Sequence, residues 1–339
     1  LRRDVPLPLS TFVGIAIDVD RKVWAIARGS SVAVRLDPAT YAYDSRDRCT
    51  QIGHNGAVLA DYTWLGNALS RRDTTCDYPG GTKPKFKSDY QRDGALRVTK
   101  LVNEHLTADQ AGSTYGDLGT WDYTYDTGGN ELSMAQGGSM SGLAASAIHS
   151  YDSAHRLITT HNSDTQNWSL PTARLSWYTY DDLGNRISHK KRTASAIGYA
   201  HDKANRMTTL ANKTQGYDLA GNLTLAYSAD RGTSYVYRYD HHNRMTGIYD
   251  STNTTRKAAF TYDALGRRVE FINDIPATTT RYYYDGVNEV VEDDQSAARQ
   301  RYYVHGISYI DERLMMYSDD LARPFYYVID RMYNVRMLV

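Results

Sequence analysis

The 339-residue sequence predicts an all-β protein, a long antiparallel sheet built from consecutive hairpins. Three observations predict this class: a Tyr-Asp motif recurs about every 22 residues, apolar and polar residues alternate before it, and turn-forming residues follow it. The composition agrees, because 29 Tyr stand against 5 Phe, 33 Asp against 6 Glu and 29 Arg against 10 Lys. These ratios favour residues suited to strands and turns. The balanced charge and the lack of an apolar run of about 18 residues argue against a nucleic-acid-binding polycation and a membrane-spanning helix.

Residues 1–40 are expected to form a segment distinct from the rest. Within 14–40, three alternating apolar runs are separated by 18–22 and 28–31, and none of them contains Tyr. This segment resembles a single blade of an NHL-type β-propeller. One blade cannot close a propeller. It is therefore expected to be the last blade of a truncated propeller, or an extra strand layer packed on the sheet.

The repeat itself begins with Tyr-Asp and covers 125–303 clearly. From Tyr180 onward, successive copies start 21, 16, 22, 23 and 22 residues apart, which is the length of two short strands with their turns. Residues 41–124 are predicted to carry degenerate copies, at Tyr43, Tyr62 and Tyr90. The clear copies are YDTGGNEL from Tyr125, YDSAHRLI from Tyr151, YDDLGNRI from Tyr180, HDKANRMT from His201, YDLAGNLT from Tyr217, YDHHNRMT from Tyr239, YDALGRRV from Tyr262 and YDGVNEVV from Tyr284.

Each position of the repeat has a predicted role. Tyr235, Tyr237 and Tyr239 lie two residues apart, so they share one face of a strand. The Asp after the last Tyr can accept a backbone N–H two residues on, and the residue four places after the Tyr must tolerate positive φ, which predicts a type I turn with a bulge. That position holds Gly184, Gly221 and Gly266, with Asn205, Asn243 and Asn288 where Gly is missing. The following Arg is expected to pair with a turn Asp, at Arg156, Arg186, Arg206, Arg244 and Arg268.

The motif carries a family resemblance. YDDLGNRI and YDALGRRV are similar to the YD repeats, also called Rhs repeats, of Rhs proteins, the C components of Tc toxins and the teneurins. Residues 304–339 resemble the start of the Rhs core-associated region. The family's DPxGL-like autoproteolytic motif is not matched: the one Asp-Pro, Asp37-Pro38, is followed by Ala-Thr. We interpret the chain as part of a longer polypeptide.

The resemblance implies that the sheet coils into a solenoid-like shell or tube that encloses the chain's own C-terminal cargo. Residues 41–339 give roughly 27 strands, which at about 4.8 Å apart form a sheet roughly 130 Å wide. Wound once, this sheet makes a ring roughly 40 Å across. Its first and last strands would be uncovered, and exposed edges invite pairing. We therefore expect the chain to be completed by the remainder of its own polypeptide or by identical copies stacking into a tube or filament.

The sequence predicts no catalytic, cofactor-binding or metal-binding residue. Asp18 and Asp20 lack the Gly and Glu of a calcium loop, so a turn is expected. His241 and His242 are expected to be solvated turn residues. The acidic cluster 292–294 could imitate the carboxylate pair of a glycosidase, but we interpret it as a solvated loop between repeats. A phosphate-binding loop at 137–142 is not expected either.

Two further features leave alternatives open. Cys49 and Cys76 are too few for a disulfide framework, and the alternatives are one bridge or two free thiols. The N-x-[ST] sequons begin at Asn167, Asn212, Asn222 and Asn253, and they matter only if the protein passes through a glycosylating pathway.

The sequence is compatible with three functions for this chain. The first is a non-enzymatic structural scaffold, extracellular or at the cell surface, with no cofactor and no nucleic-acid partner. The second is a cell-surface adhesion module that binds glycans or proteins through the NHL-like segment and the tyrosines, since aromatic rows interleaved with Arg can stack sugars or bases. The third is a carbohydrate-active enzyme on a β-solenoid.

Overall fold

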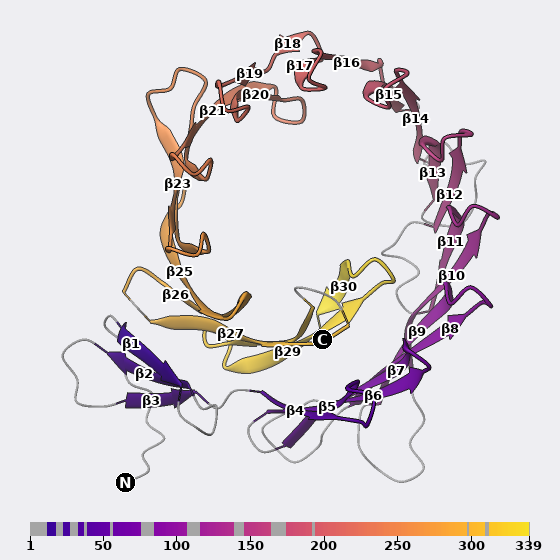
Figure 1. The fold of residues 1–339 in the computed structure, drawn as a ribbon, viewed down its shortest axis with the longest axis vertical. Coiled ribbons are helices and arrows are strands. Elements are labelled where there is room, and N and C mark those ends of the chain that lie inside the picture. Colours follow the sequence, from indigo (N-terminus) through magenta and orange to yellow (C-terminus); the bar gives the residue numbers. More distant parts are fainter. Residues whose placement is uncertain are drawn as a thin grey trace. The chain divides into compact units, whose positions relative to one another are not determined.

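The computed structural model describes residues 12–17, 23–27, 33–36, 39–54, 57–75, 85–106, 116–138, 146–163, 174–191, 194–296, 298–308 and 312–338. Every element in this part of the chain is a β-strand, which confirms the all-β class (Figure 1). The chain divides into two compact units. Unit 1 comprises residues 1–118 and 279–339, and unit 2 comprises residues 119–278.

The N-terminal segment forms a three-stranded antiparallel sheet of its own. It consists of β1 (Phe12–Ile17), β2 (Val23–Ala27) and β3 (Ala33–Leu36), in that order. Trp24 pairs with Ala16 on one side and with Arg35 on the other. The three alternating runs in the sequence therefore correspond to three strands, as expected.

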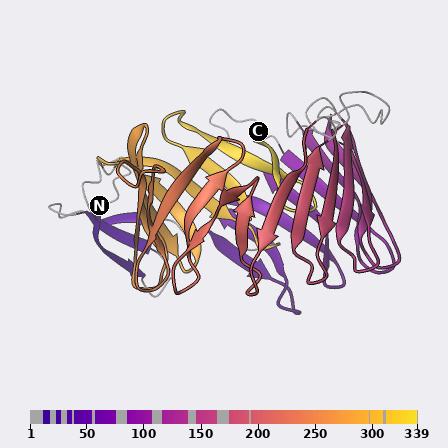
Figure 2. The ribbon, with the colours of Figure 1, turned by 90° about the horizontal axis from the view of Figure 1, so that it is seen from above.

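A 15-stranded sheet follows, in which the strands stand in sequence order and pair antiparallel. Figure 2 shows strands of this kind running side by side, with the turns at the two edges. The strands are β4 (Thr40–Tyr43), β5 (Cys49–His54), β6 (Ala57–Leu65), β7 (Ala68–Thr75), β8 (Lys85–Arg92), β9 (Val98–Leu106), β10 (Gly116–Tyr125), β11 (Glu131–Gly137), β12 (Ser146–Tyr151), β13 (Leu157–Ser163), β14 (Arg174–Tyr180), β15 (Arg186–Lys191), β16 (Ile197–His201), β17 (Met207–Leu210) and β18 (Lys213–Thr214).

A second large sheet contains 12 strands, again in sequence order. The 15 and 12 strands together equal the number that the repeat length predicts for 41–339. They are β19 (Gly216–Tyr217), β20 (Leu223–Ser228), β21 (Thr233–Tyr239), β22 (Met245–Tyr249), β23 (Arg256–Tyr262), β24 (Arg268–Asp274), β25 (Ala277–Asp285), β26 (Asn288–Asp293), β27 (Arg299–His305), β28 (Arg313–Ser318), β29 (Arg323–Ile329) and β30 (Val335–Leu338).

The sheet of consecutive hairpins is divided into two at the junction of β18 and β19. The repeats that start at His201 and Tyr217 are only 16 residues apart, so β18 and β19 have just two residues each. The buried side chain of Gln215 spans the break. Its amide nitrogen donates to the Lys213 carbonyl at 3.2 Å, and its oxygen accepts from the Tyr227 backbone N–H at 3.1 Å. One side-chain amide thus replaces the missing ladder hydrogen bonds.

Unit 1 contains a core in which early and late hairpins of the chain pack together. Phe86 of β8 meets Tyr326 of β29 edge to face, with ring centroids 5.9 Å apart and the Tyr326 side chain fully buried. The Asn103 amide of β9 donates to the Ile329 carbonyl of β29 at 3.4 Å. Strands more than 200 residues apart therefore share one core, because a twisted sheet with an apolar face must bury it against another layer.

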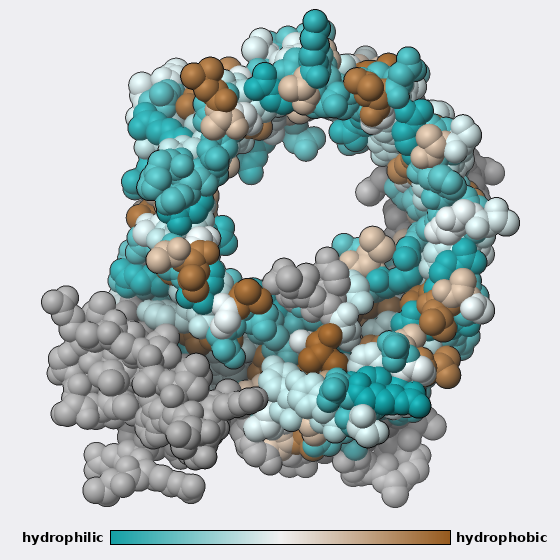
Figure 3. Space-filling model, viewed as in Figure 1, coloured by the Kyte–Doolittle hydropathy of each residue, from teal (hydrophilic) through white to brown (hydrophobic). Residues whose placement is uncertain are grey.

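Unit 2 buries far fewer side chains than unit 1. Trp121 is its one described side chain with less than 2% exposure, and most other described residues in its strands are half-buried. Its most exposed apolar residues lie singly in turns, as with Leu183, Leu219 and Leu265. The face drawn in Figure 3 is mostly hydrophilic, with small separated hydrophobic spots. Isolated apolar side chains of this kind are normal on a protein surface.

Candidate functional site

The hairpin turn of most repeats is built around the Asp of the motif, as the sequence predicts. The Asp181 carbonyl accepts the Gly184 N–H at 3.1 Å, and its carboxylate Oδ1 accepts the N–H groups of Leu183 at 3.0 Å and Asn185 at 2.8 Å. Gly184 has φ of +88°, the left-handed conformation that the turn requires at this position. Asn205 and Asn243 adopt it in their repeats with φ of +60° and +62°. The turn with its bulge is thus confirmed.

The residue four places after the Asp closes the turn with its side chain. Arg156 donates to Asp152 Oδ2 at 2.7 Å, and Asn185 donates to Asp181 Oδ2 at 2.9 Å. The prediction is wrong for Arg186, which stands one place further and lies over aromatic rings instead. Arg268, at the same place in its repeat, also lies over aromatic rings. The same Arg–Asp pair recurs at Arg48–Asp44, Arg97–Asp93, Arg206–Asp202, Arg244–Asp240 and Arg267–Asp263. The ring contacts are those of Arg186 with Tyr178 and Tyr199 and of Arg268 with Phe260 and Phe271.

These hydrogen bonds favour the ionised form of the turn Asp. The Arg48 guanidinium lowers the pKa of Asp44 to about 2, and the backbone N–H groups of Arg46 and Arg48 act in the same direction. Partial burial acts in the opposite direction. A carboxyl with a lowered folded-state pKa stabilises the fold above its unfolded pKa, near 3.8, and loses that contribution as the pH falls through about 2. The turns are therefore expected to remain closed in mildly acidic solution.

Successive repeats are joined by the Tyr hydroxyl. In each case the hydroxyl donates to the backbone carbonyl that lies five residues after the turn Asp of the preceding repeat. The partner of these hydroxyls is thus the backbone and not an Asp side chain. The bonds are Tyr151 to Glu131 at 3.0 Å, Tyr180 to Leu157 at 2.7 Å, Tyr217 to Met207 at 3.0 Å, Tyr239 to Leu223 at 2.9 Å and Tyr262 to Met245 at 2.7 Å.

The residue that closes the turn also contacts the next repeat. Arg244 donates to the Asp263 carbonyl at 3.1 Å and lies 5.0 Å from the ring centroid of Tyr262. Where Asn replaces Arg, its amide donates to the left-handed residue of the next turn, as from Asn222 to Asn243 at 2.8 Å. Neighbouring repeats are thus joined by side chains and, except between β18 and β19, also by the strand ladder.

Replacing Tyr262 with Phe is expected to lower the free energy of unfolding of unit 2 by about 0.5–1.5 kcal/mol, because the Met245 carbonyl loses its donor. Urea unfolding followed by tyrosine and tryptophan fluorescence measures this loss. Tyr235→Phe is the matched control, since the Tyr235 hydroxyl makes only a 3.4 Å contact with Arg231 at the surface. Equal losses in both variants would contradict the role of the Tyr hydroxyl in joining repeats.

Two predictions for the final repeats are wrong. Asn288 does not take the left-handed turn position: Gly286 does, with φ of +59°, and Asn288 pairs with Asp285 in the strands. A Gly directly after the Asp allows a tighter two-residue loop. The acidic cluster is not a solvated loop either, because Glu292 and Asp293 lie in β26 and the Asp293 side chain is fully buried. Of these three acidic residues, only Asp294 lies in a turn, where its carboxylate accepts backbone N–H groups.

Burial determines the ionisation of Asp293. Its removal from water raises its pKa from 3.8 to about 6, against opposing effects of the Tyr283 hydroxyl and the Arg299 guanidinium. A carboxyl with a raised folded-state pKa contributes most to the free energy of unfolding below its unfolded pKa, and this contribution is lost as the pH rises through about 6. At neutral pH, Asp293 is therefore a buried charge that costs stability.

Asp293→Asn is expected to stabilise unit 1, and to do so by about 1–2 kcal/mol more at pH 7.5 than at pH 4.5, because each pKa unit corresponds to about 1.4 kcal/mol. Denaturant unfolding at the two pH values measures the difference. Asp294→Asn is the control, because Ser296 and other donors lower the pKa of Asp294, so that variant should lose stability at pH 7.5. A gain for Asp293→Asn that does not change with pH would contradict the raised pKa.

A buried ion pair joins the two ends of the chain within unit 1. Arg72 of β7 and Glu312, which precedes β28, lie 240 residues apart, and Arg72 Nη1 donates to Glu312 Oε1 at 2.5 Å. Their side chains are 4% and 1% exposed. The other carboxylate oxygen accepts the Ser308 N–H at 2.7 Å, and a Cβ on Gly306 would overlap it. No sequence pattern signals this pair, since neither residue belongs to the repeat motif.

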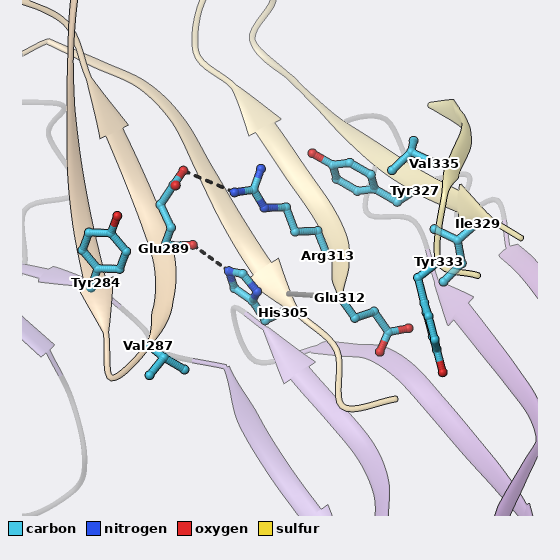
Figure 4. A pocket seen from close by; sticks show the side chains of 10 residues that line it. All are labelled: Tyr284, Val287, Glu289, His305, Glu312, Arg313, Tyr327, Ile329, Tyr333 and Val335. Carbon is cyan, nitrogen blue, oxygen red and sulfur yellow. Dashed lines mark hydrogen bonds and ion pairs between the residues drawn. The ribbon is translucent and has the colours of Figure 1, made fainter. Parts of the chain in front are cut away.

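A pocket of about 560 Å³ lies in the C-terminal part of unit 1. Its walls come from β25 to β30. Figure 4 shows Tyr284 and Glu289 on one side, Tyr327 and Tyr333 on the other, and Arg313 between them. The sequence does not single out these residues for a site, because they come from several strands and the turns between them.

The histidines, cysteines, sequons and aspartates considered in the sequence form no binding site among the described residues. His241 and His242 are exposed turn residues, as expected. Cys49 is buried with a free thiol, and Cys76 lies outside the described residues. The Asn222 amide is engaged by Asp218 and Asn243, whereas Asn212 and Asn253 are exposed. Asp18, Asp20, Gly142 and Asn167 also lie outside the described residues, and within the described ones no His, Cys, Asp and Glu cluster suits a metal ion.

Comparisons with known proteins give partial likenesses. No protein-family model matches the chain. Over 155 residues, 44% of this chain, the sequence is 24% identical to the tRNA3(Ser)-specific nuclease WapA of Bacillus spizizenii, and the match covers 6% of that protein. Among solved structures, the chain is similar over 94% of its length to 21% of a chain in TcdB2-TccC3-TEV, with a TM-score of 0.34 and 11% identity. A porin-like protein from Bacteroides uniformis matches over 66% of this chain and 93% of its own, with a TM-score of 0.26 and 7% identity.

The chain thus spans a small part of the curated relative and of the first structural neighbour. Its all-β fold of consecutive antiparallel hairpins follows from the strand pairing itself. In the described part of the chain, we find no helix with the length and apolar character needed to cross a membrane.

Proposed function

We propose that this chain is a non-enzymatic structural protein, a YD-repeat β-shell or scaffold that encloses cargo or assembles into an extracellular tube or filament. The observation that carries the proposal is the repeat linkage, in which the hydroxyl of Tyr151, Tyr180, Tyr217, Tyr239 or Tyr262 joins its repeat to the one before it. Such a sheet extends by adding hairpins, without a new core for each one. A sheet that extends in this way suits the wall of a shell or tube better than a compact catalytic domain.

The proposal includes the chain's partners and location. The partners are the remainder of its own polypeptide or identical copies, with an enclosed polypeptide as cargo and no nucleic acid. Two strands of unit 1, β4 and β30, are edge strands of their sheets, and such edges pair with further strands unless they are blocked. The location is extracellular or the cell surface.

Light scattering and negative-stain imaging of the purified chain test the proposal. We expect hollow particles or stacks whose mass exceeds 38.2 kDa and grows with concentration. Leu338→Lys places a charge on the edge strand β30, where Leu338 is 43% exposed, and should reduce the stacking without unfolding the chain. A compact, solid monomer at all concentrations would contradict the proposal, and turnover of a substrate by the chain would contradict its non-enzymatic part.

A further inference from the structure

The pocket in unit 1 has the build of a ligand-binding site. Its volume of about 560 Å³ falls within the range of about 300–1,000 Å³ that is typical of small-molecule sites. Tyr284, Tyr327 and Tyr333 supply aromatic walls, and Glu289 and Arg313 supply polar groups between them (Figure 4). Aromatic walls with a few converging polar groups are the usual composition of such sites.

The polar groups are held in place before any ligand arrives. Arg313 Nη2 lies 3.3 Å from Glu289 Oε1, and its guanidinium lies 3.9 Å from the ring centroid of Tyr303. His305 Nε2 lies 2.6 Å from the Glu289 backbone carbonyl. The ion pair and the ring contact fix the positions of the Arg313 donors and the Glu289 carboxylate, and the His305 contact holds the Glu289 backbone, so that little side-chain entropy is lost on binding.

The charges of the pocket cancel. Arg313 neutralises Glu289, and Glu312, which also lines the pocket, is already bound by Arg72 and by the Ser308 N–H. An anionic ligand would meet two carboxylates, and a cationic ligand would meet the Arg313 guanidinium. Neither gains a net attraction, and both lose solvation on entering the pocket. The charge balance therefore favours a neutral ligand.

We propose that this pocket binds a neutral, hydroxyl-rich ligand of the size of a mono- or disaccharide. Each hydroxyl of a sugar both donates and accepts, so two adjacent hydroxyls match a carboxylate acceptor and guanidinium donors that lie 3.3 Å apart. The Tyr rings provide apolar faces for the C–H side of a sugar ring. This binding site goes beyond the scaffold role and does not depend on it.

Calorimetric titration of the folded chain with glucose, galactose, N-acetylglucosamine, maltose and cellobiose tests the proposal. We expect at least one sugar to bind with a Kd of about 1 mM or lower. Arg313→Met should weaken that binding at least tenfold. The matched control is Arg301→Met, which removes a similar Arg–Glu pair, with Glu292 at 2.8 Å, from the neighbouring strand β27 but outside the pocket lining.

A second variant tests the pocket in case Arg313→Met does not fold. Val335→Trp places a large side chain at the pocket wall from a residue that is 53% exposed, so it should block binding while the thermal unfolding stays close to that of the wild type. The proposal is overturned if no sugar binds, or if Arg313→Met and Arg301→Met have equal effects. It is also overturned if putrescine or citrate binds in a manner that depends on Arg313, because the ligand would then be charged.

Discussion

Arg72→Met is expected to lower the free energy of unfolding of unit 1 by about 3–5 kcal/mol, because it leaves the Glu312 carboxylate buried without its counter-charge. Burial alone would lower the pKa of Arg72, and Glu312 more than offsets this effect, so the pKa of the guanidinium lies above its usual value. The Arg72 guanidinium therefore stays protonated in the folded chain. Since about 1 kcal/mol corresponds to 2–4 °C for a unit of this size, the Tm should fall by roughly 10 °C.

Differential scanning calorimetry with denaturant unfolding measures this effect, and two variants control it. Arg71→Met changes the neighbouring residue on the same strand, whose side chain is 40% exposed and pairs with Asp73, so its cost should stay below about 1 kcal/mol. The double variant Arg72→Met with Glu312→Leu removes both charges and should be more stable than Arg72→Met alone. Equal effects of Arg72→Met and Arg71→Met would show that the Arg72–Glu312 pair is not buried in solution.

The local parts of the fold could be predicted from the sequence because short-range chemistry determines them. The turn at Asp181 to Asn185 needs only an acceptor side chain at its start and a residue that tolerates positive φ at its fourth position. Strand number and order follow from the repeat length. Even the break at Gln215 has a visible signal, the 16-residue spacing between the repeats at His201 and Tyr217, although a short spacing alone does not say that the ladder is interrupted.

The contacts between layers could not be predicted in this way. Arg72 and Glu312 are separated by 240 residues, and their pairing depends on which hairpins stack in unit 1. The same reason explains the error at Asp293, which reads as one of three consecutive acidic residues but faces inward on a strand. The pocket is the third example, because its residues come from strands that a local pattern treats separately. Period and turn chemistry specify a hairpin, but they do not specify what covers its face.

Trp121→Ala is expected to be the most damaging single substitution in unit 2, with a loss of about 3–5 kcal/mol in the free energy of unfolding. Trp121 is fully buried in β10, and its indole N–H donates to Gln136 Oε1 of β11 at 3.1 Å. The Gln136 backbone N–H in turn donates to Ser146 Oγ of β12 at 3.2 Å. Truncation therefore leaves a large cavity and removes the indole donor to Gln136 Oε1 at the point where three strands meet.

Calorimetry and hydrogen exchange distinguish this effect from a general loss of a Trp. In Trp121→Ala, we expect faster amide exchange in β10 to β12 and a lower Tm for unit 2. Trp177→Ala is the matched control in the same sheet, since Trp177 of β14 is only half-buried and its ring has Lys190 Nζ 5.9 Å from its centroid. That variant should cost less than half as much, because the site is open to water and little cavity forms. Equal losses would mean that unit 2 is stabilised by its aromatic rows in general and not by the core around Trp121.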